Sequence, residues 1–176
     1  MIPGMSVSAF TDLHVIISLI AIISGITVAL GLLGTRRMPA MTAIFLIATA
    51  ATSLTGFMFA TPAEAPRVIG SLDPPQVVGI ISLIFLALAV LALYGYRLAG
   101  SWRGTYVIST IIALYFNCFV LVVQSFQKIA FVHALAPTQK EPPFAVAQAI
   151  LLILFVGLGI AAFKKFRPTA QARALA

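Results

Sequence analysis

Five long stretches of this sequence contain no Asp, Glu, Lys or Arg. They cover residues 13–33, 40–59, 77–96, 106–126 and 144–163. Each is about 20 residues long, and a helix of that length crosses a hydrocarbon core of roughly 30 Å. Because lipid offers backbone N–H and C=O groups no partners, such segments must be helices that pair these groups internally. The sequence therefore predicts an all-α transmembrane helical bundle of five spans, with residues 1–176 as a single integral membrane domain.

Basic residues are divided unevenly between the two sides that five spans would create. Eight lie in the loops after the first and third spans or beyond the fifth span, against three on the opposite side. The eight are Arg36, Arg37, Arg97, Arg103, Lys164, Lys165, Arg167 and Arg173. Cytoplasmic segments of membrane proteins carry this kind of excess, so we expect the N-terminus outside and the C-terminus in the cytoplasm.

The net charge of +7 raises the question of acidic partners. Most of this charge lies at loop ends and in the C-terminal tail, immediately beside predicted spans, where anionic lipid headgroups are the nearest acidic groups. We therefore expect Lys164, Lys165 and Arg167 to contact such headgroups at the bilayer surface, and we expect no binding to nucleic acid.

Small and hydroxyl-bearing residues form stripes along three of the spans. The stripes are Ala21, Gly25 and Ala29 on the first span, Thr42, Thr49, Ser53 and Gly56 on the second, and Gly157 and Ala161 on the fifth. Helices in lipid pack closely at such residues, so the stripes predict helix contacts within the bundle. An alternative is that these stripes and Trp102 contact other proteins, in a homo-oligomer or a larger membrane complex. The short loops at 34–39 and 99–104 predict antiparallel neighbours.

The fourth span departs from the apolar pattern. Its polar residues Asn117, Gln124 and Lys128 are spaced by seven and four positions and share one helical face, with Gln127 beside it. Burying an amide without a partner costs about 2–7 kcal/mol. We therefore expect this face to point into the bundle, with Gln124 contributing to a cavity that opens outward. The alternatives are a buried hydrogen bond to Ser or Thr of the second span and, for Lys128, extension of its stem to the headgroups.

Both histidines, His14 and His133, belong to the outer side of the predicted bundle. Two histidines at one depth could ligate haem b, or a transition metal if further ligands joined them. The alternative for His14 is an interfacial position, with Thr11 and Asp12 capping the first helix. Cys118 is the only cysteine, which excludes an internal disulfide and a C-x-x-C pair. We expect no resident cofactor and no metal.

The polar residues of the outer face suggest a ligand site and not a catalytic set. The candidates are His14, Asn117, Gln124, Lys128, His133 and Glu141, with Asp12 and Gln139 nearby. The sequence contains no H-E-x-x-H, no phosphate-binding glycine loop and no pair of intramembrane carboxylates. We therefore expect a non-enzymatic membrane protein with a binding, transport-related or accessory role through its outer face. The alternative is a redox subunit that holds haem or quinone between His14 and the Gln124/Lys128 face.

Four runs of the sequence together indicate a resemblance to known proteins. They are TSLTGF at 52–57, VGIISL at 78–83, LVVQSFQK at 121–128 and ALAPTQKEPPF at 134–144. With these runs the chain resembles a group of small bacterial multi-pass membrane proteins of uncharacterised function, over most of its length. The resemblance implies a location in the bacterial inner (plasma) membrane. It implies no reaction and assigns no functional residues.

The charge distribution generates a prediction about topology. In a Cys118→Ala background, Gly70→Cys and Gln139→Cys should react with a membrane-impermeant thiol reagent added to intact cells, whereas Arg36→Cys and Ser101→Cys should not. The reason is the excess of basic residues on the side that contains Arg36 and Ser101. Labelling is read by gel shift, with permeabilised cells as the control for reactivity. Labelling at Arg36→Cys from outside would reverse the assigned orientation.

Overall fold

The structure is a computed structural model that describes residues 6–59 and 74–167. Within these ranges the regular elements are α1 (Val7–Leu33), α2 (Pro39–Met58), α3 (Pro74–Val90), η1 (Leu91–Gly95), α4 (Trp102–Lys128), α5 (Ala130–His133) and α6 (Pro142–Lys165). Five helices are long and apolar enough to cross a membrane, the third being α3 continued by the π-helical turn η1. The predicted all-α fold with five helices of membrane-spanning length is therefore confirmed, although α1 and α4, at 27 residues each, are longer than the predicted spans.

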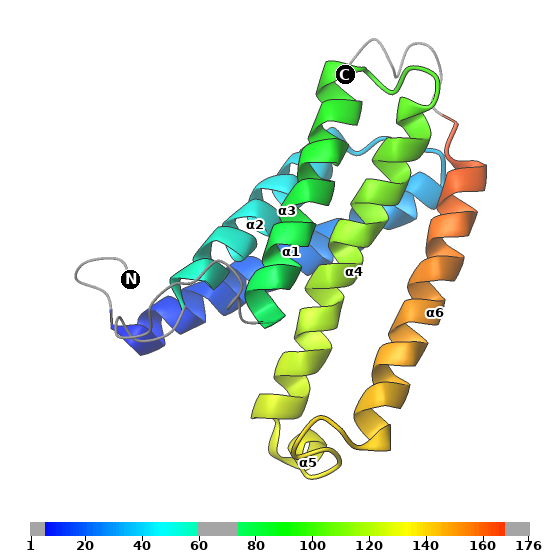
Figure 1. The fold of residues 1–176 in the computed structure, drawn as a ribbon. Helices are drawn as coiled ribbons and strands as arrows, with labels where there is room; N and C mark the ends of the chain where they lie inside the picture. Colours follow the sequence, from blue (N-terminus) through cyan, green and yellow to red (C-terminus); the bar gives the residue numbers. More distant parts are fainter. Residues whose placement is uncertain (1–5, 60–73, 168–176) are drawn as a thin grey trace.

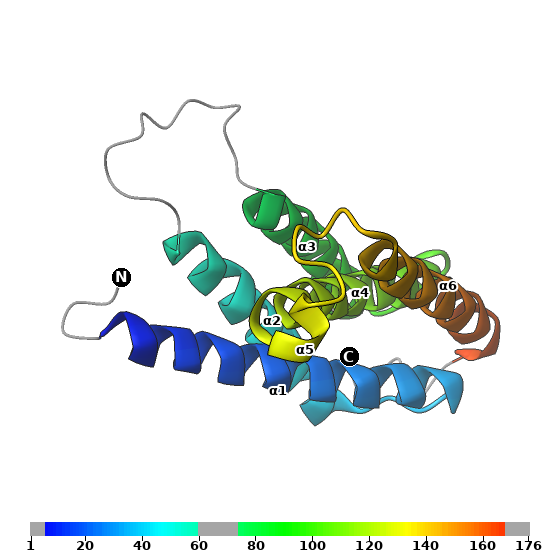
Figure 2. The same ribbon diagram turned by 90° about the horizontal axis from the view of Figure 1, so that it is seen from below.

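The helices converge at one end of the bundle and diverge at the other. The principal packed pairs are α1 with α2, α3 with α4, and α4 with α6, and smaller contacts join α2 to α3 and α1 to α4 and α6. Figure 1 shows α1 running obliquely, with its C-terminal end near the C-terminal end of α6 and its N-terminal end far from α6. Figure 2 shows the same divergence from below. The antiparallel pairings of α1 with α2 and of α3 with α4 agree with the prediction from the short loops.

The start of α1 is set by a capping side chain and not by hydropathy. It begins at Val7, well before its apolar stretch, because the hydroxyl oxygen of Ser6 accepts a hydrogen bond from the backbone N–H of Ala9 at 3.2 Å. The expectation that Thr11 and Asp12 cap this helix is wrong. Thr11 lies inside the helix, and its hydroxyl donates to the carbonyl of Val7 at 2.9 Å.

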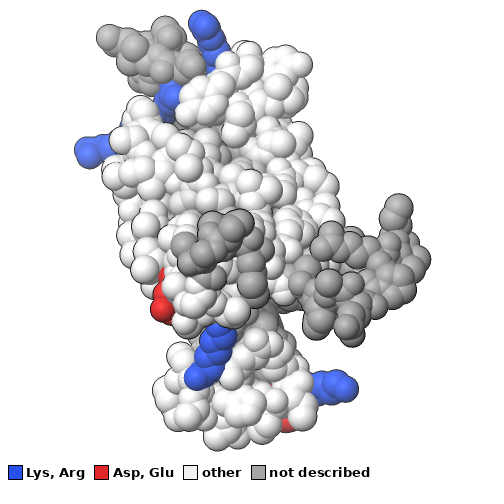
Figure 3. All heavy atoms as spheres, turned by 90° about the vertical axis from the view of Figure 1, so that its left-hand side faces the viewer, with Lys and Arg blue, Asp and Glu red and all other residues white. Residues whose placement is uncertain are grey.

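Basic side chains gather at the end where the helices converge. We call this the basic end, and its residues are Arg36, Arg37, Arg97, Arg103, Lys164, Lys165 and Arg167. The opposite end carries Lys128 and Lys140 together with Asp12 and Glu141. Figure 3 shows charged side chains toward the two ends of one face and a broad uncharged band between them, which fits a chain that crosses a bilayer. Arg67, Glu64, Asp73 and Arg173 lie outside the described residues.

At the basic end, side chains of other segments bind the last carbonyls of α6. Arg103 of α4 donates through Nη1 to the carbonyls of Phe163 at 2.9 Å and Phe166 at 2.6 Å. Its guanidinium carbon also lies 5.1 Å from the centroid of the Phe163 ring. Thr35, after α1, donates to the carbonyl of Lys165 at 3.2 Å. Carbonyls at a helix C-terminus lack partners within the helix, so these bonds both satisfy α6 and join it to α4 and α1.

The short turn between η1 and α4 is packed against the chain itself. Trp102 stacks on Tyr96, with ring centroids 3.8 Å apart and planes 4° from parallel. Arg97 and Leu98 adopt left-handed backbone with φ of 48° and 59°, a conformation that costs about 1–2 kcal/mol per residue. Leu98 is nevertheless fully buried in the core, which offsets that cost. Trp102, considered above as a contact for partner proteins, therefore has an aromatic partner within the chain.

Two of the three small-residue stripes lie at helix contacts as expected. Ala21, Gly25 and Ala29 are buried, and a Cβ atom on Gly25 would lie 2.6 Å from Cδ1 of Leu114 in α4 and 2.8 Å from the ring of Phe45 in α2. The stripe on α2 also lies inside the bundle, because Thr42, Thr49 and Ser53 are buried.

The stripe predicted on α6 is wrong in its helical phase. A Cβ atom on Gly157 would meet no atom within 4 Å, whereas one on Gly159 would contact Ile111 of α4. Ala162 is the buried residue of α6. Both faces of this helix are equally rich in small and apolar residues, so hydropathy and residue size did not distinguish the face that meets α4.

The close approach at Gly25 generates a prediction about stability. Gly25→Leu should destabilise the protein by about 1–3 kcal/mol, because a larger side chain must push α1 away from Leu114 and Phe45. Gly157→Leu, the same substitution on the open surface of α6, is the matched control and should be close to neutral. Unfolding by SDS titration in mixed micelles measures both. Equal stability of the two variants would contradict the packing described for α1.

Candidate ligand-binding cavity

A cavity of about 650 Å³ lies among α1, α2, α3 and α4. It is lined by the N-terminal half of α1, the C-terminal half of α2, the beginning of α3 and the C-terminal half of α4, so it occupies the end opposite the basic end. Its walls are largely apolar and include Leu19, Ile22, Phe57, Phe116 and Val120. Volumes of about 300–1,000 Å³ are typical of sites for small organic molecules.

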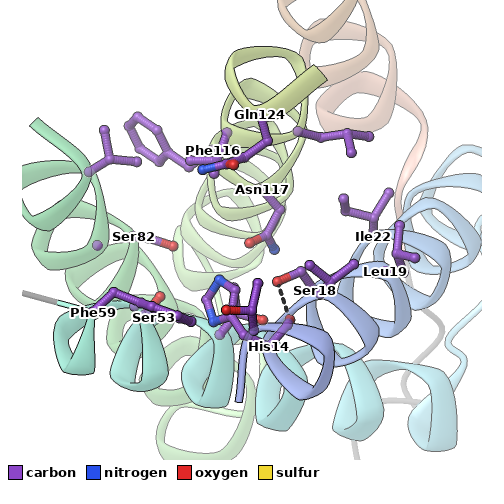
Figure 4. A pocket seen from close by; sticks show the side chains of 18 of the residues that line it. His14, Ser18, Leu19, Ile22, Ser53, Phe59, Ser82, Phe116, Asn117 and Gln124 are labelled. Atoms are coloured by element: carbon purple, nitrogen blue, oxygen red, sulfur yellow. Dashed lines mark hydrogen bonds between the residues drawn. The ribbon is translucent and has the colours of Figure 1, made fainter. Parts of the chain in front are cut away.

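Polar side chains from all four helices converge on this cavity. Figure 4 shows Asn117 and Gln124 of α4 across the cavity from Ser18 and His14 of α1, with Ser53 of α2 and Ser82 of α3 at the side. Asn117 and Lys128, both in the lining, are eleven positions apart, or ~16 Å along a helix. The cavity therefore extends from near the middle of α4 to its last turn.

Asn117 forms a hydrogen bond between helices. Its Nδ2 donates to the hydroxyl oxygen of Thr49 in α2 at 2.9 Å, and the asparagine side chain is only 9% exposed. This is the alternative that the sequence left open for the amides of α4, a bond to Ser or Thr of the second span. For Asn117 that alternative is correct, and the residue lies at the base of the cavity as a structural contact.

Gln124 occupies a different environment, about two helical turns beyond Asn117. It lines the cavity, and its Oε1 is buried without a hydrogen-bond partner. The hydroxyls of Thr52 in α2 and Ser82 in α3 line the same cavity and are also buried without partners, with Ser82 only 3% exposed. Buried polar atoms normally have partners from protein or from bound molecules. Three oxygens without a protein partner are thus buried in the wall of one cavity.

His14 is held at the cavity wall by α2. Its Nδ1 lies 2.7 Å from the hydroxyl oxygen of Thr55, and its ring meets Phe59 edge-on with centroids 5.1 Å apart. Lys128 also lines the cavity, at the last turn of α4. Four of the six predicted site residues, His14, Asn117, Gln124 and Lys128, are thus brought together.

The other two predicted site residues lie elsewhere. His133 is in the short helix α5, where its Nδ1 donates to the carbonyl of Phe126 at 2.9 Å, and it does not line the cavity. Glu141 precedes α6 and accepts hydrogen bonds from the hydroxyl of Thr138 at 2.9 Å and from the N–H of Lys140 at 3.1 Å. Desolvation acts to raise the pKa of Glu141, but these loop hydrogen bonds outweigh it and the pKa lies below its ordinary value.

The arrangement does not provide the ligands expected of a haem or metal site. Only His14 of the two histidines faces the cavity, so a pair of axial histidines is not formed there. Among residues 6–59 and 74–167, no three His, Cys, Asp or Glu side chains are grouped closely enough to hold a metal ion. Cys118 of α4 is buried in the core.

The sequence interpretation missed several lining residues, namely Ser18, Thr52 and Ser82, and it missed Thr55 behind His14. Ser82 had a usable signal, because it is the only polar residue between Gln76 and Tyr94 in an otherwise apolar span. Ser18 and Thr55 had none, because both donate to carbonyls of their own helix, as most hydroxyl residues in membrane helices do.

Fold and site together define a multi-pass helical membrane protein with a small-molecule-sized cavity at the end opposite its basic loops. Comparison with known proteins gives no match: no family model, no curated protein and no solved structure is significantly similar to this chain. The functional argument therefore rests on the chemistry of the cavity.

The bond between α2 and α4 generates a prediction. In a double-mutant cycle of Asn117→Leu and Thr49→Val, the two substitutions should be coupled by roughly 0.6–1.7 kcal/mol, the average and the largest value found for hydrogen bonds between helices in a membrane protein. The physical reason is that either single change leaves the other group buried without its partner. SDS unfolding of the four proteins measures the coupling. Additive effects would show that Asn117 and Thr49 do not stabilise each other.

Proposed function

We propose that this protein is a non-enzymatic inner-membrane protein that binds a small, largely apolar molecule with a neutral hydrogen-bonding group, in the outer half of the bilayer. The observation that supports this most directly is the set of three buried oxygens without partners, on Thr52, Ser82 and Gln124, around one cavity of about 650 Å³. A transport-related or accessory role would use the same site, because both begin with binding.

The composition of the lining selects the kind of molecule. Its walls are mainly apolar, and of the lining side chains that the structure describes, Lys128 is the single strongly basic one and none is acidic. A cation would find no carboxylate among these side chains, and an anion would find its positive partner there only at the last turn of α4. A neutral molecule with one polar group and an apolar body satisfies the hydroxyls and the amide without a buried charge.

The placement in the outer half rests on the distribution of basic residues. The cavity is at the end opposite Arg36, Arg37 and Arg103, and that end faces outward if the positive-inside rule holds for this chain. A molecule soluble in lipid would reach the site from the bilayer, or from the outer surface near Lys128. The basic end would then lie against anionic headgroups of the cytoplasmic leaflet.

A photoreactive probe tests binding in this cavity. A diazirine-bearing aliphatic alcohol, added to the protein in lipid nanodiscs, should label lining residues of α3 and α4, and excess octanol should suppress the labelling. Gly56→Leu should reduce this labelling several-fold, because Gly56 lines the cavity and a Cβ atom there would meet only His14, at 3.9 Å. Mass spectrometry of peptides locates and quantifies the label.

Two further variants make the result decisive. Gly157→Leu on the open face of α6 is the matched control and should label as the wild type does. Gln124→Leu keeps the side-chain volume and removes the amide, so it should remain folded and lose saturable labelling. Labelling that is uniform over the lipid-facing surface, or unchanged in both Gly56→Leu and Gln124→Leu, would refute binding at this site.

A further inference from the structure

The hydrogen bonds around His14 assign the positions of its protons. The hydroxyl of Thr55 contacts three groups: the carbonyl of Ala51 at 2.7 Å, the carbonyl of Thr52 at 3.2 Å and Nδ1 of His14 at 2.7 Å. A carbonyl can only accept, and a hydroxyl has one proton, so Thr55 donates to the carbonyls of its own helix. Toward His14 it can then only accept, and Nδ1 of the imidazole must be the donor.

This assignment leaves the other ring nitrogen as an acceptor. In a neutral imidazole one nitrogen carries the proton and the other carries a lone pair, so Nε2 of His14 is unprotonated. An imidazole is largely neutral at neutral pH unless a nearby acid favours the charged form. Among residues 6–59 and 74–167, the ionisable side chains that line the cavity are His14 and Lys128, and neither is an acid. The cavity wall therefore presents the lone pair of a neutral imidazole.

From this geometry we infer that the site recognises its ligand through a hydroxyl that donates to Nε2 of His14, and that the ligand is a phenol-type molecule with an apolar substituent. This inference rests on the proposed function and names the chemical class of its ligand. The aromatic side chains Phe57, Phe59 and Phe116 line the cavity and suit an aromatic ring. A second oxygen on the ring, as in a hydroquinone, would lie beside the wall that contains Ser82 and Gln124, whose unpaired oxygens it would reach after rotation of these side chains.

Because Nε2 of His14 is a hydrogen-bond acceptor, the site should prefer phenols over similar molecules that have no proton to donate. A ketone, an ether or an oxidised quinone has only acceptor oxygens, and these would face the lone pair of Nε2 without a proton between them. A carboxylate would add repulsion from that lone pair and a desolvation cost away from Lys128. A phenol supplies the missing proton and remains neutral, so it forms the bond at least cost.

The test uses a matched pair of probes, a hexyl-substituted phenol and its methyl ether, which differ in the hydroxyl proton. The phenol should bind wild-type protein in nanodiscs about 3- to 10-fold more tightly than the ether, which corresponds to one net hydrogen bond. His14→Phe should abolish this preference. His133→Phe, the matched control at the histidine outside the cavity, should retain it.

A spectroscopic measurement on unmodified protein keeps the test independent of how the variants fold. The chain has two histidines, so ¹⁵N-histidine labelling gives two imidazole spin systems, and each should show a protonated Nδ1 because both Nδ1 atoms contact oxygen partners. Adding the phenol should shift Nε2 of His14 and leave His133 unchanged. Adding the methyl ether should not reproduce the shift of the His14 Nε2 resonance that the phenol causes.

The outcomes separate this inference from the proposed function. If phenol and ether bind equally, and Gly56→Leu weakens the binding of both, the cavity binds apolar molecules and the donor inference is wrong. A protonated Nε2 on His14 in the unliganded protein would also overturn the inference. If Gly56→Leu leaves the binding of both probes unchanged, the molecules bind elsewhere and the proposed function is itself refuted.

Discussion

Lipid provides no hydrogen bonds, and most features of this protein follow from that constraint. Each span pairs its backbone groups internally, and many serines and threonines donate to carbonyls of their own helix, as Ser18, Ser24 and Thr55 do. Side chains that cannot do so are directed inward. Asn117 finds its partner in Thr49 on a neighbouring helix, whereas Gln124 and Ser82 face a cavity without a partner from protein.

The two ends of the bundle differ in how closely their helices pack. At the basic end, glycine allows close contact: a Cβ atom on Gly104 would lie 2.7 Å from the ring of Phe163, and Arg103 binds the terminal carbonyls of α6. At the opposite end α1 diverges from α6, and the space among α1 to α4 is the cavity. Tight packing at one end therefore provides a rigid base from which the cavity can open at the other.

The chemistry of the cavity depends on groups that do not line it as well as on those that do. Thr55 contacts His14 from α2, and its bond to the carbonyl of Ala51 determines which nitrogen of the imidazole carries the proton. The hydroxyl of Thr55 makes an ordinary intrahelical hydrogen bond, and through that bond it fixes which nitrogen of His14, on another helix, accepts a hydrogen bond. Such supporting contacts orient histidines in many functional sites. Here the consequence is an acceptor in an apolar space, which favours a neutral donor as the ligand.

The number of spans, their approximate positions and the inward polar face of α4 could be predicted from the sequence, because hydropathy and the helical repeat are properties of one segment at a time. The partners of that face could not. Asn117 and Gln124 are both amides on one face, yet one is bonded to Thr49 and the other faces a cavity. His14 and His133 match in predicted depth but lie in different surroundings. These differences depend on how the helices pack together, as in the close contact of Gly25 in α1 with α2 and α4. No single segment contains that information, because a crossing angle is a property of two helices packed together.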